Sequence, residues 1–155
     1  MTVKTMKSSR TEQVQILSQS TLNGYKRLFG GKLMEWIDVV AAVTARRHSG
    51  KNVTTAAIDS LEFKRAAYAN DTLVLMGEIS YVGKTSMEVT VKTYVESLDG
   101  TRELINQAFV IMVALDDNEK PTPVPSIVPE NDEEKAILEE GRRRAEARKK
   151  RGCAG

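Results

Sequence analysis

One segment of the chain, Gly31 to His48, carries the strongest apolar pattern at helical spacing. Leu33, Ile37, Val40 and Thr44 recur on this spacing. Because apolar residues lie on more than one face of the helix, we expect it to be buried. A chain of 155 residues fits one domain. The remaining elements must therefore surround this helix.

After Asn52 the apolar residues follow the two-residue period of a β-strand. The pattern is clearest in residues 87–97, where Met87 and Val89 face one side and Glu88 faces the other. This alternation predicts a sheet with one buried and one solvated face. We expect strands at residues 12–18, 53–63, 72–82, 87–97 and 103–115, with turns at 83–86 and 98–101. The order predicts an α+β fold in which a curved antiparallel β-sheet wraps around a central α-helix.

The two ends of the chain differ from this central part. Residues 1–11 are polar and basic and are expected to be flexible, so the domain is expected to span residues 12–129. The last part of this domain, 116–129, is a linker that contains all four prolines. Residues 130–155 form a helical tail that begins with acidic and ends with basic residues and contains the single cysteine, Cys153. With no apolar run for a signal peptide or a membrane span, we expect a cytoplasmic protein without a membrane partner.

Asp38 is the most unusual residue of the central helix, because it interrupts the apolar run from Trp36 to Val43. A buried and unpaired carboxylate is costly, so Asp38 must face water, pair with a cation or serve a function. Gly30 and Gly31 precede it at the start of the helix, where free N–H groups can stabilise a developing oxyanion. A carboxylate near them can accept a proton from an attacking water.

Other kinds of site find little support in the sequence. One histidine and one cysteine cannot form a zinc cluster. The G-x-S-x-G motif is absent, and the Gly30-Gly31 pair is neither a P-loop nor a dinucleotide motif. His48 is expected to cap the C-terminal end of the helix. Nucleic-acid binding is disfavoured, because acidic residues offset the basic tail and no aromatic residues are interleaved with it.

The segment around Asp38 also resembles a known signature. Asn23-Gly24 followed by Phe29-Gly30-Gly31-Lys32-Leu33-Met34-Glu35-Trp36-Ile37-Asp38 is similar to the signature of hot-dog-fold acyl-CoA thioesterases of the acyl-CoA hydrolase family. Further similar segments follow in the same order, at residues 53–59, 81–89 and 124–125. The chain departs from the pattern after Phe63, where Ala66 replaces a usual proline and Asn70-Asp71 replaces a Gly-Asp or Gly-Glu pair.

This resemblance implies an acyl-CoA thioesterase that releases a free carboxylic acid and CoA without a metal or a prosthetic group. It implies a homo-oligomer, a dimer or a trimer of dimers, with active sites shared between protomers. In that reading Asp38 of one protomer activates water or attacks the thioester, facing Asn23 of the other, while the Gly30 and Gly31 amides polarise the carbonyl. Coenzyme A is bound only as part of the substrate or product. Its path is bordered by residues 82–86, namely Val82, Gly83, Lys84, Thr85 and Ser86.

Two alternative functions stay open at this stage. A non-catalytic acyl-CoA or nucleotide binding module could use the same cleft. A hot-dog dehydratase usually needs a histidine near the helix, and His48 lies about 15 Å from Asp38 along the helix axis. The tail arginines 142–144 are further candidates for contacts with the nucleotide phosphates.

Overall fold

The computed structural model describes residues 2–24, 28 and 30–152, and it describes the backbone alone of residues 60–62. Phe29 of the signature and Cys153 of the tail lie outside the described residues. The described elements are β1 (Lys4–Thr5), the 3-10 helix η1 (Lys7–Ser9), β2 (Thr11–Ile16), the 3-10 helix η2 (Gln19–Thr21), α1 (Gly30–Ser49), β3 (Asn52–Phe63), β4 (Thr72–Val82), β5 (Ser86–Glu96), β6 (Arg102–Leu115), β7 (Ile127–Val128) and α2 (Asp132–Lys150).

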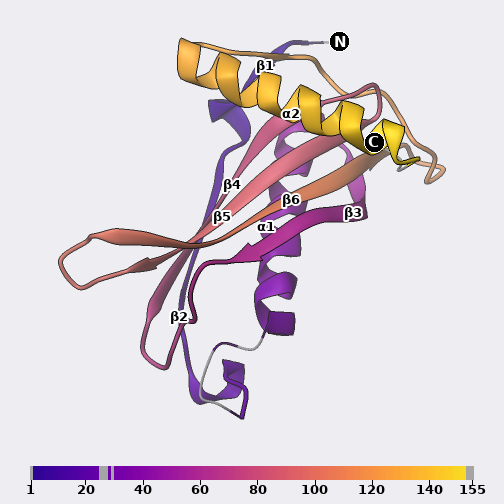
Figure 1. The fold of residues 1–155 in the computed structure, drawn as a ribbon. Coiled ribbons are helices and arrows are strands. Elements are labelled where there is room, and N and C mark those ends of the chain that lie inside the picture. The colour runs from indigo at the N-terminus through magenta and orange to yellow at the C-terminus, as the bar shows by residue number, and fades with distance from the viewer. Residues whose placement is uncertain (1, 25–27, 29, 153–155) are drawn as a thin grey trace.

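Five strands form one antiparallel sheet in the order β2-β4-β5-β6-β3. Helix α1 packs against one face of this sheet, and α2 crosses the opposite face (Figure 1). The predicted curved antiparallel sheet around a central helix, with a C-terminal helix, is therefore confirmed. Strands β2 to β6 begin and end within two residues of the expected ranges. Both β2 and β3 are edge strands, each with one side unpaired in the described chain.

The core lies between α1 and the sheet. Met87 and Val89 of β5 are buried together with Leu33 of α1, as the alternation in residues 87–97 predicts. Each such side chain contributes about 1.5–3 kcal/mol when it is fully buried. Gly77 of β4 allows the helix to approach closely, because an added Cβ would lie 2.7 Å from Oγ1 of Thr44. This contact fixes the height of α1 above the sheet.

The opposite face of the sheet is less solvated than the sequence predicts. Glu88 and Thr90, which were expected on the wet side, are buried because α2 lies over them. Gly141 of α2 makes this contact close, since an added Cβ would overlap the carbonyl oxygen of Ser80 and lie 2.9 Å from Cβ of Tyr81. Alternation along one strand distinguishes its two faces, but it does not reveal whether a distant helix covers the polar one.

The N-terminal segment contains short elements that the sequence does not predict. Strand β1 pairs in parallel with β7, with Lys4 opposite Ile127, and Met6 is fully buried. The end of α1 reaches the same proline-rich region, because Nε2 of His48 lies 2.8 Å from the carbonyl oxygen of Pro125. The proline-rich segment is thus held by both the N-terminus and the central helix.

Helix α2 begins with the acidic turn that the sequence predicts. The side chain of Asn131 accepts a hydrogen bond of 2.8 Å from the backbone N–H of Glu134, which caps the helix. The Glu134 side chain in turn accepts a hydrogen bond of 3.0 Å from the backbone N–H of Glu130 and pairs with Arg10 at 3.1 Å. These contacts fix the start of α2 against the segment before β2.

Candidate active site

Asp38 lies in the middle of α1 and faces β3. The hydroxyl of Thr55 on β3 donates a hydrogen bond of 2.6 Å to Oδ1 of Asp38. Asp38 is half-buried, and it forms no ion pair with any described residue. The second carboxylate oxygen, Oδ2, has no hydrogen-bond partner in the described part of the chain. One oxygen is therefore held in place while the other is available to a ligand or a water.

Thr55 is a candidate site residue that the sequence alone did not reveal. It is exposed in the single chain because β3 is an edge strand. Two apolar side chains of α1 beside Asp38 are also exposed, Met34 by 40% and Val39 by 50%. A threonine within an alternating strand gives no local signal of this role, because its partner lies 17 residues earlier on a different element.

Gly30 and Gly31 are the first two residues of α1. Their N–H groups belong to the first turn, which has no partners within the helix. They precede Asp38 by eight and seven residues, respectively, which corresponds to about 11–12 Å along the helix axis. Side chains on a helix lean toward its N-terminus, which shortens this gap. An added Cβ at Gly30 would touch no described atom within 4 Å, so the surface beside the helix start is open.

Asn23 lies at the opposite end of β3 from Thr55. It lines a cavity of about 320 Å³ together with Phe63, the last residue of β3. Within one chain, the Asp38–Thr55 pair and Asn23 are therefore not brought together. From Thr55 to Phe63, eight residues of strand correspond to roughly 26 Å.

The departure from the family pattern after Phe63 is accommodated locally. Asn70 has φ of 69°, the left-handed conformation that Asn tolerates in place of glycine. The backbone N–H of Leu28 donates a hydrogen bond of 2.8 Å to the carbonyl oxygen of Ala67, next to the position of the missing proline. Asn70 therefore supplies the backbone conformation that a glycine would provide at this turn.

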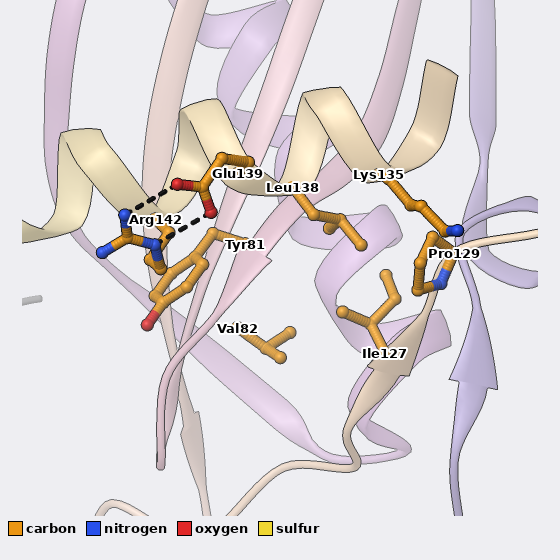
Figure 2. A pocket seen from close by; sticks show the side chains of 8 residues that line it. All are labelled: Tyr81, Val82, Ile127, Pro129, Lys135, Leu138, Glu139 and Arg142. Carbon is orange, nitrogen blue, oxygen red and sulfur yellow. Dashed lines mark hydrogen bonds and ion pairs between the residues drawn. The ribbon is translucent and has the colours of Figure 1, made fainter. Parts of the chain in front are cut away.

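Residues 82–86 form a tight connection between β4 and β5. The N–H of Gly83 donates to the carbonyl oxygen of Ser86 at 2.9 Å, and two backbone hydrogen bonds of 3.0 Å hold Lys84 and Thr85 to neighbouring segments. Ser86 is buried, whereas Lys84 is exposed. An adjoining cavity has a volume of about 340 Å³. Val82 lines it together with residues of α2 and the proline-rich segment (Figure 2).

The arginines of α2 are paired with carboxylates. Arg142 contacts Glu139 at 2.7 Å and Glu146 at 2.6 Å, and the first of these pairs is drawn in Figure 2. Arg144 contacts the buried Glu88 at 2.7 Å. Phosphate contacts by these two arginines would require the pairs to be exchanged. The sequence did not predict that the tail is ion-paired with the sheet.

The described residues contain neither a candidate metal site nor a candidate membrane-spanning helix. No group of three or more His, Cys, Asp or Glu side chains among them is arranged to hold a metal ion. None of the helices in the described ranges is long and apolar enough to cross a membrane.

Known proteins share both the sequence and the fold. Residues 25–100 match the model of the thioesterase superfamily. The uncharacterized acyl-CoA thioester hydrolase YkhA of Bacillus subtilis is 43% identical over 130 residues, which cover 83% of this chain and 76% of the relative. The chain belongs to the thioesterase superfamily.

Two solved structures of the superfamily extend this comparison to nearly the whole chain. A hexameric acyl-CoA thioesterase, solved in its apo form, is 40% identical with a TM-score of 0.93, and the match covers 98% of both chains. An acyl-CoA hydrolase from Staphylococcus aureus, solved with butyryl coenzyme A, coenzyme A and coenzyme A disulfide, is 35% identical with a TM-score of 0.92. That match covers 96% of this chain and 92% of the other. The predicted resemblance to hot-dog acyl-CoA thioesterases is thus confirmed.

Proposed function

We propose that this protein is an acyl-CoA thioesterase, which hydrolyses acyl-CoA to a free carboxylic acid and CoA. The observation that carries the proposal is the half-buried Asp38 carboxylate, which Thr55 holds by one oxygen on a helix that begins with two glycines. The family relationship supports it, because relatives at 43% and 40% identity are named as acyl-CoA thioester hydrolases or thioesterases.

In the proposed reaction Asp38 is the general base. A water molecule bound at Oδ2 gives its proton to the carboxylate as its oxygen attacks the thioester carbonyl carbon. Negative charge develops on the carbonyl oxygen. The N–H groups of Gly30 and Gly31 stabilise it from the protomer opposite Asp38, because within one helix they lie too far from this carboxylate. The C–S bond then breaks, and the proton held by Asp38 passes to the departing thiolate. We assign the base role because a base needs only to reach the water, which a partly exposed carboxylate does.

The complete site is proposed to need two protomers. Strand β3 has a free edge, with the Asp38–Thr55 pair near one end and Asn23 near the other. If two copies pair their β3 edges antiparallel around a two-fold axis, the first end of one strand meets the second end of its partner. Asn23 of one protomer then faces Asp38 of the other and positions the carbonyl or the water. The same pairing would cover the exposed Met34 and Val39.

We also propose the assembly and the path of CoA. Relatives described as hexameric suggest that three such dimers associate. Residues 82–86 would border the pantetheine and phosphates, with the exposed Lys84 as the cation of this segment. Coenzyme A would enter as part of the substrate, and the reaction would need no metal or prosthetic group.

The deciding experiment measures release of the CoA thiol from a panel of acyl-CoAs of increasing chain length. We expect saturable turnover that persists in the presence of a metal chelator. The matched controls are Asp38→Asn, which removes the base, and Glu35→Gln, which removes an exposed charge from the same helix. Saturable binding of acyl-CoA without thiol release by the wild type would instead favour a non-catalytic acyl-CoA binding module.

A further inference from the structure

Arg148 of α2 joins two strands that are not neighbours in the sheet. Its NH1 nitrogen lies 3.0 Å from Oε2 of Glu88 on β5 and 3.1 Å from Oδ2 of Asp59 on β3. Strand β6 lies between these two strands. The Arg148 side chain is only 3% exposed, so its guanidinium is held in place rather than free in solvent. We name Arg148, Glu88 and Asp59 the β3 clamp.

Glu88 does not need Arg148 for its own neutralisation. Arg144 already approaches its two oxygens, with NH2 2.7 Å from Oε1 and Nε 3.0 Å from Oε2. The hydroxyl of Ser80 donates to the same carboxylate at 2.5 Å. The Arg144 guanidinium also lies 3.9 Å from the centre of the Phe109 ring. The distinctive contact of Arg148 is therefore the one with Asp59. Arg151 also approaches Asp59, with NH2 3.4 Å from Oδ1, but its side chain is 54% exposed, so Arg148 is the buried partner of this carboxylate.

Asp59 lies in a bulge of β3. Ile58 pairs with Val110 and Leu61 pairs with Ala108, so residues 59 and 60 together oppose Phe109 alone. A bulge bends its strand and re-aims the residues on either side of it. Here the bulge separates Thr55, four residues before Asp59, from Phe63, four residues after it. These two residues mark the two half-sites of the proposed shared active site.

We propose that Arg148 and Asp59 are positioning residues for the thioesterase reaction. By holding the β3 bulge against α2 and β5, the β3 clamp sets the spacing between the Asp38–Thr55 pair and the end of the strand near Asn23. This inference rests on the proposed function and deepens it. Neither residue touches the substrate, and both act through the shape of the edge strand.

The test compares Arg148→Gln with Lys149→Gln, because Lys149 is the next residue on the same helix and is exposed, whereas Arg148 is buried. In the Arg148 variant we expect kcat to fall about tenfold or more, because small displacements of reacting groups are costly, with KM changed less than about twofold. We also expect faster amide hydrogen exchange in residues 56–63, with oligomer mass unchanged. Lys149→Gln should leave all of these quantities as in the wild type.

A second comparison separates positioning from loss of stability. In a Thr55→Val background, Arg148→Gln should lower kcat by much less than in the wild type, because both changes disturb the same Asp38 geometry. Asp59→Asn should reproduce the effects of Arg148→Gln and serves in its place if that variant does not fold. Equal losses of kcat in both backgrounds would overturn the positioning role.

The exchange measurement keeps the inference separate from the proposed function. Unchanged exchange in residues 56–63 of a folded Arg148→Gln protein would overturn the β3 clamp, whatever the activity. If the wild type releases no thiol from any acyl-CoA, the proposed function fails. Faster exchange confined to residues 56–63 would then still support the clamp as the device that fixes the edge strand.

Discussion

The hydroxyl of Thr55 donates a hydrogen bond of 2.6 Å to Oδ1 of Asp38 and so joins the central helix to the edge strand β3. Hydrogen bonds to charged groups contribute about 1.5–3 kcal/mol, more than those between neutral groups. Because Thr55 is exposed in the single chain, this bond contributes little to folding. In the proposed site it fixes one oxygen of the carboxylate and leaves the other for the attacking water.

Replacing Thr55 by valine keeps the shape of the side chain and removes the donor. We expect kcat for thiol release to fall about 10- to 100-fold, which corresponds to the loss of one charge-assisted hydrogen bond. Thr55→Ser should retain most of the activity because it keeps the hydroxyl. Equal rates for the valine variant and the wild type would remove Thr55 from the site.

Replacing Asp38 by asparagine removes the proposed base at nearly constant volume. We expect turnover to fall about 10²- to 10⁴-fold, the usual contribution of general base catalysis. The melting temperature and the oligomer mass should stay as in the wild type, because Asp38 is half-buried and has no ion-pair partner among the described residues. A variant that turns over at a near-normal rate would exclude Asp38 from the mechanism.

A mixture of Asp38→Asn and Asn23→Ala subunits tests the shared site directly. Each variant alone should have low activity because both of its sites carry a substitution. After random exchange, half of the dimers are hybrids with one intact site each, so about a quarter of wild-type activity should return. Mass spectrometry should verify the exchange first. No recovery in verified hybrids would contradict a site built from two protomers.

Most of the fold could be predicted from the sequence, because its main elements have strong local periods. The helical spacing of Leu33, Ile37 and Val40 and the alternation along β5 depend only on neighbouring residues. The burial of Glu88 beneath α2 could not be predicted in this way, because the arginines that pair with Glu88 lie 56 and 60 residues later in the chain.

In the candidate site, too, the residues with a local sequence signal could be predicted, and those that depend on distant contacts could not. Asp38 is visible in the sequence because a charge interrupts an apolar run, and Gly30 and Gly31 are visible as a helix start. Thr55 is not, because its importance comes from a contact between two elements. The proposed role of Asn23 depends on a second protomer, so neither the pattern of one chain nor its structure tests it.

From the burial of His48 we predict that the protein loses stability at acidic pH. Burial lowers the pKa of this imidazole below its ordinary value of 6.5, and the charge of Lys4 lowers the pKa further, while the hydrogen bond to Pro125 opposes both effects. Since the folded pKa lies below the unfolded one, protons bind preferentially to the unfolded chain. The free energy of unfolding should therefore be level above about pH 6.5 and fall as the pH drops below it.

Thermal unfolding between pH 8 and pH 5 measures this contribution of His48. His48→Gln keeps a side-chain donor for the Pro125 carbonyl and cannot titrate, so its melting temperature should decrease less toward pH 5 than that of the wild type. Parallel profiles for the two proteins would show that the acid sensitivity arises from other groups.

From the close packing of Gly141 we predict that Gly141→Ala destabilises the protein, although a change from glycine to alanine usually stabilises a helix. Alanine at an exposed helical glycine gains about 1 kcal/mol from helix propensity. At Gly141 the new Cβ would overlap the carbonyl oxygen of Ser80, a backbone atom that cannot move aside, so α2 must shift from the sheet. We expect a net loss of about 1–3 kcal/mol, typical of overpacking, measured as a melting temperature several degrees lower. Glu140→Ala, at an exposed position on the same helix, is the matched control and should change the melting temperature little. A Gly141→Ala protein that is more stable than the wild type would show that α2 does not pack closely on β4.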